Sequence, residues 1–190
     1  MTSVDFFSIF IYLYILWFLP AYLLIQNRLL DVFQNIAAAC EGLEAQLVIS
    51  LGGSTTPESL PKFLGNPIVV SYAPQLELLQ KATLTITHAG MNTTLESLSQ
   101  GVPMVAIPVA NDQPGVAARI AWTGVGEVVP LKQVSVPKLR SAIQKVLTEP
   151  SYKARAIALQ QAIQRSGGTR RAAEIIEQVI STGEPVLVQQ

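Results

Sequence analysis

The stretch from Thr83 to Glu96 constrains the fold more than any other part of the chain. Residues 83–87 are β-branched or apolar at almost every position, which is typical of a buried strand. Gly90 then opens a segment whose apolar residues recur at helical spacing. The sequence therefore predicts a strand, a sharp turn and a helix in direct succession. The turn contains His88, the only histidine of the chain.

Further strands and helices are predicted on both sides of this unit. Apolar runs typical of strands occupy residues 46–51, 67–71, 104–108 and 128–129. Helical periodicity marks residues 26–43, 76–82, 114–122, 135–147, 152–163 and 169–180. Strands that alternate with helices in this way predict an α/β fold, with a Rossmann-like parallel sheet flanked by helices.

The predicted turn and helix start have the chemistry of a diphosphate site. The first amides of a helix lack internal partners and carry the positive end of its dipole. Gly90 allows close approach to the backbone, while Asn92 and Thr93 offer side-chain donors in the first turn. Glu96 is four residues beyond Asn92, on the same face. A carboxylate there needs donors of its own, such as ribose hydroxyls, so the pattern suggests a nucleoside diphosphate.

Four blocks in this region resemble the donor-binding signature of inverting UDP-glycosyltransferases with the GT-B fold, in particular the bacterial macrolide and carotenoid glucosyltransferase branch. They are Tyr72-Ala-Pro-Gln75, His88-Ala-Gly-Met-Asn-Thr-Thr-Leu-Glu96, Gly101-Val-Pro-Met104 and Asp112-Gln113. The resemblance extends from about Gln26 to about Ile180. It implies the donor-binding C-terminal half of an enzyme that transfers a hexose from UDP, with UDP-glucose as the expected donor, to a hydroxyl acceptor.

The resemblance also assigns roles to the donor-binding residues. It implies that Tyr72 stacks on the uracil, that the backbone beside it, at Ala73, contacts the base edge, and that Gln75 lies near the nucleoside. The remaining residues divide by the part of the donor they would hold: the diphosphate by His88, Gly90, Asn92 and Thr93, the ribose by Glu96, and the sugar hydroxyls by Asp112 and Gln113. Plant relatives usually have Trp at the Tyr72 position, a departure that concerns the base preference.

Structural alternatives exist for three of these residues. Tyr72 also fits an ordinary half-buried aromatic residue at a strand end, and His88 a structural histidine at a strand terminus. Asp112 precedes Pro114 and therefore also suits the N-cap of a helix. No catalytic residue is predicted in this chain, because in the resembled family the general base lies mainly in the N-terminal domain, with the acceptor pocket. The alternative function is a non-catalytic nucleotide-sugar binding domain or truncated relic, and the implied partner is a separate acceptor-binding domain or chain.

Composition excludes several other functions. Thirteen basic and thirteen acidic residues give a net charge of zero, so no electrostatic attraction for nucleic acid is expected. No metal site and no cofactor are predicted, because the chain has one histidine, three aspartates and no Asp-x-Asp pair. The single Cys40 fits a buried structural thiol in a reducing, cytoplasmic compartment.

The N-terminal segment, residues 1–25, is predicted to be separate from the donor-binding domain at 26–182, and residues 183–190 are predicted to form a tail. The run from Phe6 to Ile25 has no charged residue and is just long enough to span a bilayer. One interpretation is a membrane anchor. The other is a displaced start, in which this run replaces the strand that precedes the helix at Gln26 in the resembled family.

Overall fold

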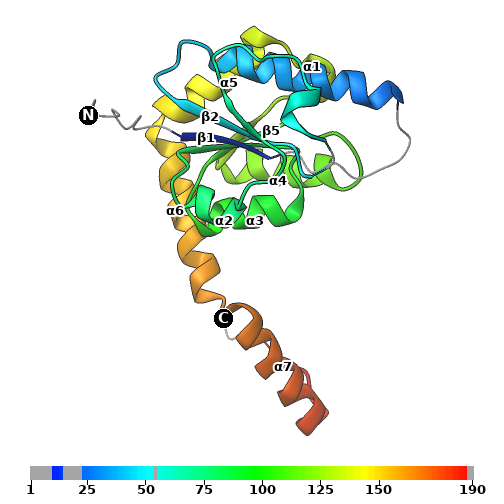
Figure 1. Ribbon diagram of the computed structural model, residues 1–190. Coiled ribbons are helices and arrows are strands. Elements are labelled where there is room, and N and C mark those ends of the chain that lie inside the picture. Colours follow the sequence, from blue (N-terminus) through cyan, green and yellow to red (C-terminus); the bar gives the residue numbers. More distant parts are fainter. Residues whose placement is uncertain (1–9, 15–22, 54, 188–190) are drawn as a thin grey trace, which may run out of the picture.

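The computed structural model describes residues 10–14, 23–53 and 55–187, which form a six-stranded parallel sheet flanked by helices (Figure 1). The strands are β1 Phe10–Tyr14, β2 Gln46–Ser50, β3 Ile68–Val70, β4 Leu84–Thr87, β5 Met104–Ala106 and β6 Gly126–Val128. The helices are α1 Leu23–Cys40, α2 Gln75–Leu79, α3 Met91–Ser99, α4 Gln113–Thr123, α5 Val136–Thr148, α6 Pro150–Arg165 and α7 Gly168–Thr182. The predicted α/β architecture is confirmed.

The strand order β3-β2-β1-β4-β5-β6 places β1 and β4 side by side at the centre of the sheet. Tyr14, the last residue of β1, is paired with Ser50 of β2 and with Thr87 of β4. In open parallel sheets of this order, ligands bind outside the carboxyl ends of the strands, where the strand order reverses. That point lies between β1 and β4, directly before His88.

The N-terminal apolar run supplies the central strand, which differs from the division expected at residue 25. Phe10–Tyr14 forms β1, and the side chain of Ile11 is fully buried, with 0% exposed. Helix α1 also begins inside the run, at Leu23. Residues 10–14 of the run therefore form a strand of the sheet, which neither the anchor nor the displaced-start interpretation expected. A strand buried on both faces is as continuously apolar as a membrane span, so composition could not distinguish the two.

The rest of the run, residues 6–9 and 15–22, lies outside the described residues. Within the ranges that the structure describes, no helix has both the length and the apolar character needed to cross a membrane.

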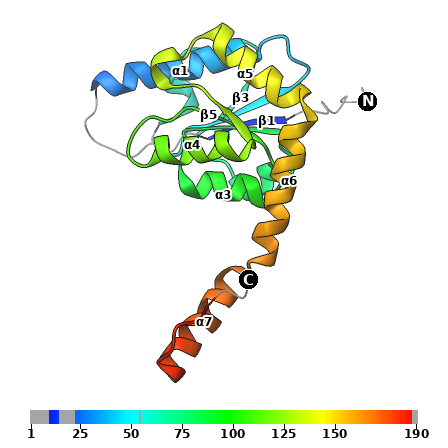
Figure 2. The same cartoon turned by 180° about the vertical axis from the view of Figure 1, so that it is seen from behind.

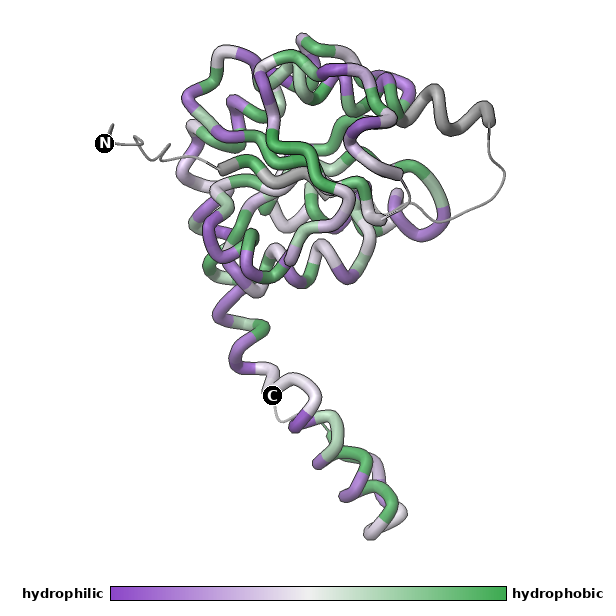
Figure 3. Tube along the Cα trace, in the orientation of Figure 1, coloured by the Kyte–Doolittle hydropathy of each residue, from purple (hydrophilic) through white to green (hydrophobic). Residues whose placement is uncertain are grey.

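Helices cover both faces of the sheet and create a core on each. Figures 1 and 2 show α1 and α5 on one face and α3 and α4 on the other. On the first face, Ile36 of α1 and Ile143 of α5 are fully buried in the same cluster as Ile49 and Ile86 of the sheet. The opposite cluster includes Met104, Ile120 and Leu98. The strands accordingly appear as a hydrophobic centre between more polar helices in Figure 3.

Helix α1 ends beside α5, which satisfies its last carbonyls. The Arg140 Nη2 atom donates hydrogen bonds to the carbonyl oxygens of Ala38 and Glu41, at 3.1 and 2.6 Å. Cys40 is buried at this helix end, and burial raises the pKa of its thiol to about 12. A thiol with so little thiolate is a poor nucleophile, which agrees with the structural role predicted for it.

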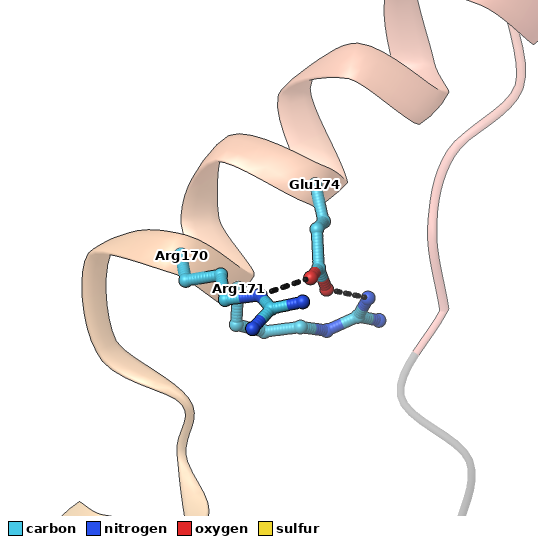
Figure 4. A network of polar contacts seen from close by, with 3 residues as sticks. All are labelled: Arg170, Arg171 and Glu174. Carbon is cyan, nitrogen blue, oxygen red and sulfur yellow. Dashed lines mark hydrogen bonds and ion pairs between the residues drawn. The ribbon is translucent and has the colours of Figure 1, made fainter.

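The last two helices extend away from the sheet. Helix α6 contacts α3 along its first part, whereas α7 projects beyond the domain and has no buried residue (Figures 1 and 2). Figure 4 shows Arg170 and Arg171 of α7 paired with Glu174, at 3.2 and 3.4 Å. Because these side chains are exposed, the pairs add little to stability. Helix α7 ends at Thr182, where the tail was predicted to begin.

Candidate functional site

A pocket of about 610 Å³ opens at the carboxyl ends of β3 and β4. Its walls come from the segment after β3, from the first turn of α2, and from the beginning of α3 with the turn before it. The lining residues are Tyr72, Pro74, Gln75, Leu76, Glu77, His88, Gly90, Met91, Asn92, Thr93 and Glu96.

Seven of the ten predicted donor-binding residues lie together in this pocket. The other three do not line it: Ala73 is buried with 2% exposed, and Asp112 and Gln113 lie on the loop after β5 and at the start of α4. Tyr72 is 70% exposed at the pocket, so the alternative of a half-buried strand-end aromatic residue does not describe it. Its stacking role, like the other assigned contacts, stays a prediction.

The turn between β4 and α3 is held in an unusual backbone conformation. Ala89 has a φ of 65°, a left-handed value that costs an L-residue roughly 1–2 kcal/mol. The residue is fully buried, and its N–H donates a hydrogen bond to the Thr87 Oγ1 atom at 3.2 Å. Strained residues of this kind persist where the surrounding structure holds them, often at binding sites. The turn brings His88 and the amino end of α3 to the same side of the sheet.

Gly90 lies close to the side chain of His88. A Cβ atom at Gly90 would lie 2.4 Å from the His88 Nε2 atom, closer than real Cβ contacts come. The backbone of Gly90 has φ −65° and ψ 139°, which any residue adopts, so conformational freedom is not the reason for glycine here. The sequence suggested that glycine lets a ligand approach. In the structure, the imidazole lies beside this glycine, which also lines the pocket.

Glu96 and Gln75 connect the two helices that form the pocket. The Gln75 Nε2 atom donates a hydrogen bond to the Glu96 Oε2 atom, from α2 to α3. The Gln75 Oε1 atom is buried and has no hydrogen-bond partner among the described residues. This contact fixes the Glu96 carboxylate at the pocket and leaves acceptor capacity for other donors, since a carboxylate offers about four lone-pair sites.

The pocket has no lysine or arginine among its lining residues, which include the carboxylates of Glu77 and Glu96. An anion bound there would depend on the amides at the beginning of α3, where only Thr94 N–H bonds back to the Gly90 carbonyl, at 3.0 Å. Asn92, Thr93 and His88 add side-chain groups. In the part of the chain that the structure describes, no group of three His, Cys, Asp or Glu residues could hold a metal ion.

Asp112 and Gln113 have other surroundings. Gln113 Oε1 accepts hydrogen bonds from the N–H groups of Val109 and Ala110, both at 2.9 Å, so this side chain orders the loop after β5. Asp112 occupies the N-cap position of α4 without a side-chain capping hydrogen bond. Its exposed carboxylate lies at a second hollow, between α3 and α4.

Sequence reasoning missed four lining residues: Pro74, Leu76, Glu77 and Met91. Three of them surround Gln75 at the beginning of α2, so recognising that this helix starts at Gln75 would have identified them. Met91 is the first residue of α3 and could have been inferred from Gly90 in the same way.

Comparisons with known proteins match the chain to glycosyltransferases. The family model for UDP-glucoronosyl and UDP-glucosyl transferase matches residues 24–165. Zeaxanthin glucosyltransferase from Pantoea ananas is 37% identical over 165 residues, which cover 86% of this chain and 38% of the relative. NDP-glycosyltransferase YjiC from Bacillus subtilis (strain 168) is 38% identical over 132 residues, covering 70% and 34%. The matched part is the C-terminal half of these relatives.

Solved glycosyltransferase structures have the same fold. The calicheamicin glycosyltransferase CalG4 superposes with a TM-score of 0.82 at 23% identity, covering 97% of this chain and 45% of that chain. The glycotransferase of kitacinnamycin gives a TM-score of 0.75 at 28% identity, covering 94% and 44%. The chain thus spans less than half the length of each of these proteins.

Proposed function

Because the chain belongs to the UDP-glucoronosyl and UDP-glucosyl transferase family, we propose that its pocket binds a UDP-sugar as the donor-binding part of an inverting, metal-independent glycosyltransferase. UDP-glucose is the donor that we propose. The observation that carries this proposal is the meeting of His88, Gly90, Asn92 and Thr93 with Glu96 in one pocket at the beginning of α3.

Each part of the donor has a group that suits it. The diphosphate carries the negative charge, and the amide end of α3 with the Asn92 amide and Thr93 hydroxyl offers donors to it. The imidazole of His88 donates a further hydrogen bond to the leaving phosphate oxygen. Glu96, held by Gln75, accepts the ribose hydroxyls. The exposed ring of Tyr72 provides a stacking surface for the uracil.

Transfer with inversion is a single displacement at the anomeric carbon. The acceptor oxygen forms its bond to that carbon as the bond to the diphosphate breaks, and UDP leaves with the electron pair. Preorganised donors around the phosphates stabilise the charge that develops there. The acceptor proton must pass to a base, which we assign to an acceptor-binding part outside this chain, since the chain spans only 38% of the zeaxanthin glucosyltransferase.

A second candidate function is nucleotide-sugar binding without catalysis. The observation that favours it is that seven of the ten predicted donor-binding residues line one pocket while the chain corresponds to less than half of its relatives. The two functions are distinguished by adding a partner that supplies the acceptor site. If the chain is the donor-binding part of a transferase, glucose is transferred only when the chain is present. If it is a binding domain without catalysis, no glucose is transferred.

Calorimetry with UDP-glucose tests donor binding. We expect equal heats with and without a chelator. Glu96→Gln should weaken binding about tenfold, because a neutral amide loses roughly 1–3 kcal/mol of charge-assisted hydrogen bonding to the ribose. Glu58→Gln, an exposed site on the loop after β2, is the matched control and should not change the affinity. Absence of heat at millimolar nucleotide from a folded chain would refute the proposal.

The base preference requires its own comparison. The solved structures of VinC and of the spinosyn rhamnosyltransferase SpnG include complexes with dTDP and thymidine diphosphate. These are properties of those proteins. The same titration with dTDP therefore measures whether the Tyr72 side of this pocket prefers uracil, as we propose, or thymine.

Membrane association through residues 6–25 conflicts with the sheet pairing. An anchor would have to remove Phe10–Tyr14 from between β2 and β4, where this strand is hydrogen-bonded on both sides. We propose instead that the run acts as part of the domain, in the cytoplasm. Retention of the full chain in carbonate-washed membranes would contradict this.

A further inference from the structure

A second hollow, of about 580 Å³, lies between α3 and α4 and is lined mainly by apolar side chains. We call it the α3–α4 groove. The two helices lie side by side on one face of the sheet in Figures 1 and 2. The apolar residues that line the groove are Met91, Leu95, Leu98, Val116, Ile120, Val125 and Leu159.

The groove begins at the donor pocket. Met91, the first residue of α3, lines both hollows. Asp112, at the beginning of α4, lines the same end of the groove and is the residue predicted to contact the donor sugar. From there the groove follows α3, whose nine residues rise about 13 Å, to Leu159 of α6. An elongated molecule in the groove would have one end beside the donor sugar.

The walls fit an apolar occupant. Met91 and Leu95 are 49% and 48% exposed, so apolar surface at the groove faces solvent and would gain free energy on being covered. The charged residues among the lining, Asp112 and Arg119, are both exposed. Apolar walls with a few polar groups are usual in binding sites for small molecules.

We propose that the α3–α4 groove binds the apolar body of an elongated hydroxyl acceptor, with its hydroxyl group at the Asp112 end. The inference rests on the proposed function, because the donor sugar sets the end at which the hydroxyl must lie. It assigns part of acceptor recognition to the donor-binding half, in addition to whatever the missing half supplies.

All-trans-retinol is a suitable probe, because it is an elongated apolar alcohol whose emission increases in an apolar site. The full chain should bind retinol. Leu95→Gln should weaken binding about five- to tenfold, because retinol would cover the exposed half of the Leu95 side chain, and glutamine replaces this apolar contact with a polar group. Ile180→Gln on α7 is the matched control: it is 79% exposed, distant from the groove, and should leave retinol affinity unchanged.

Three results separate the possibilities. Weakening by Leu95→Gln alone supports the groove, whereas no retinol binding, or equal weakening by both variants, overturns it. Helix α7 carries three large exposed apolar residues, Ile176, Val179 and Ile180, and sedimentation velocity tests whether they are a competing occupant. If the chain dimerises and both variants abolish the dimer, these residues of a second copy fill the groove, which also overturns the proposal. UDP-glucose heats measured on the same samples report the donor pocket separately. Absence of these heats refutes the proposed function, whereas donor binding without retinol binding refutes only the groove proposal.

Discussion

Ile11→Ala tests whether the N-terminal apolar run belongs to the domain. Ile11 is 0% exposed and lies in β1 between Leu47 of β2 and Leu84 of β4. The substitution removes three carbon groups, each worth about 0.8 kcal/mol when buried, and leaves a cavity among neighbours that relax only in part. Together these predict a loss of roughly 3–4 kcal/mol in the free energy of unfolding, a large fraction of the stability of a typical domain.

Urea denaturation followed by circular dichroism measures this loss. With a slope of about 2 kcal/mol per molar urea, the unfolding midpoint should fall by roughly 1.5–2 M. Ile180→Ala makes the same chemical change at a residue that is 79% exposed on α7, and it should shift the free energy by less than about 0.5 kcal/mol. If Ile11→Ala behaves like Ile180→Ala, the run does not form the central strand, and the anchor interpretation becomes the better account of residues 6–25.

Three further predictions concern the site and the core. Gly90→Ala should displace the His88 ring, whose Nε2 atom would lie 2.4 Å from the new Cβ, and lower UDP affinity about tenfold. In calorimetry, the double variant with His88→Ala should bind UDP no more weakly than His88→Ala alone, and additive losses would contradict this coupling. Asp112→Asn should leave UDP affinity intact, because the carboxylate lies outside the pocket, and should weaken UDP-glucose binding about fivefold or more, because this carboxylate is proposed to contact the sugar hydroxyls. Equal weakening of both ligands would point to a structural role at the start of α4. Cys40 should react with a disulfide reagent only after denaturation, because burial raises the pKa of its thiol to about 12; rapid reaction of the native chain at pH 8 would show that α1 opens readily.

The local parts of the site were predictable from sequence because they depend on neighbours along the chain. β-Branched residues before His88, a glycine after it and helical spacing beyond Gly90 predict a strand, a turn and a helix without any tertiary information. The four sequence blocks then indicated the family, and the match to residues 24–165 agrees.

Contacts between residues that are distant in the chain depend on how the elements pack. Gln75 and Glu96 are 21 positions apart, and they bond because α2 and α3 both begin at the same edge of the parallel sheet. Packing also placed the imidazole of His88 where a Cβ atom at Gly90 would lie, a contact that no sequence pattern contains. The same folding separated Asp112 from the pocket and placed it on the α3–α4 groove.

The N-terminal run shows the limit of sequence reasoning most directly. Its uninterrupted apolar character is required equally by a bilayer span and by a strand buried between two layers of helices, since both remove every side chain from water. Only the pairing of β1 with β2 and β4 distinguishes these environments. The apolar sequence limited residues 10–14 to environments of this kind. Pairing with strands that are distant in the chain places them at the centre of the sheet, where the side chain of Ile11 is fully buried.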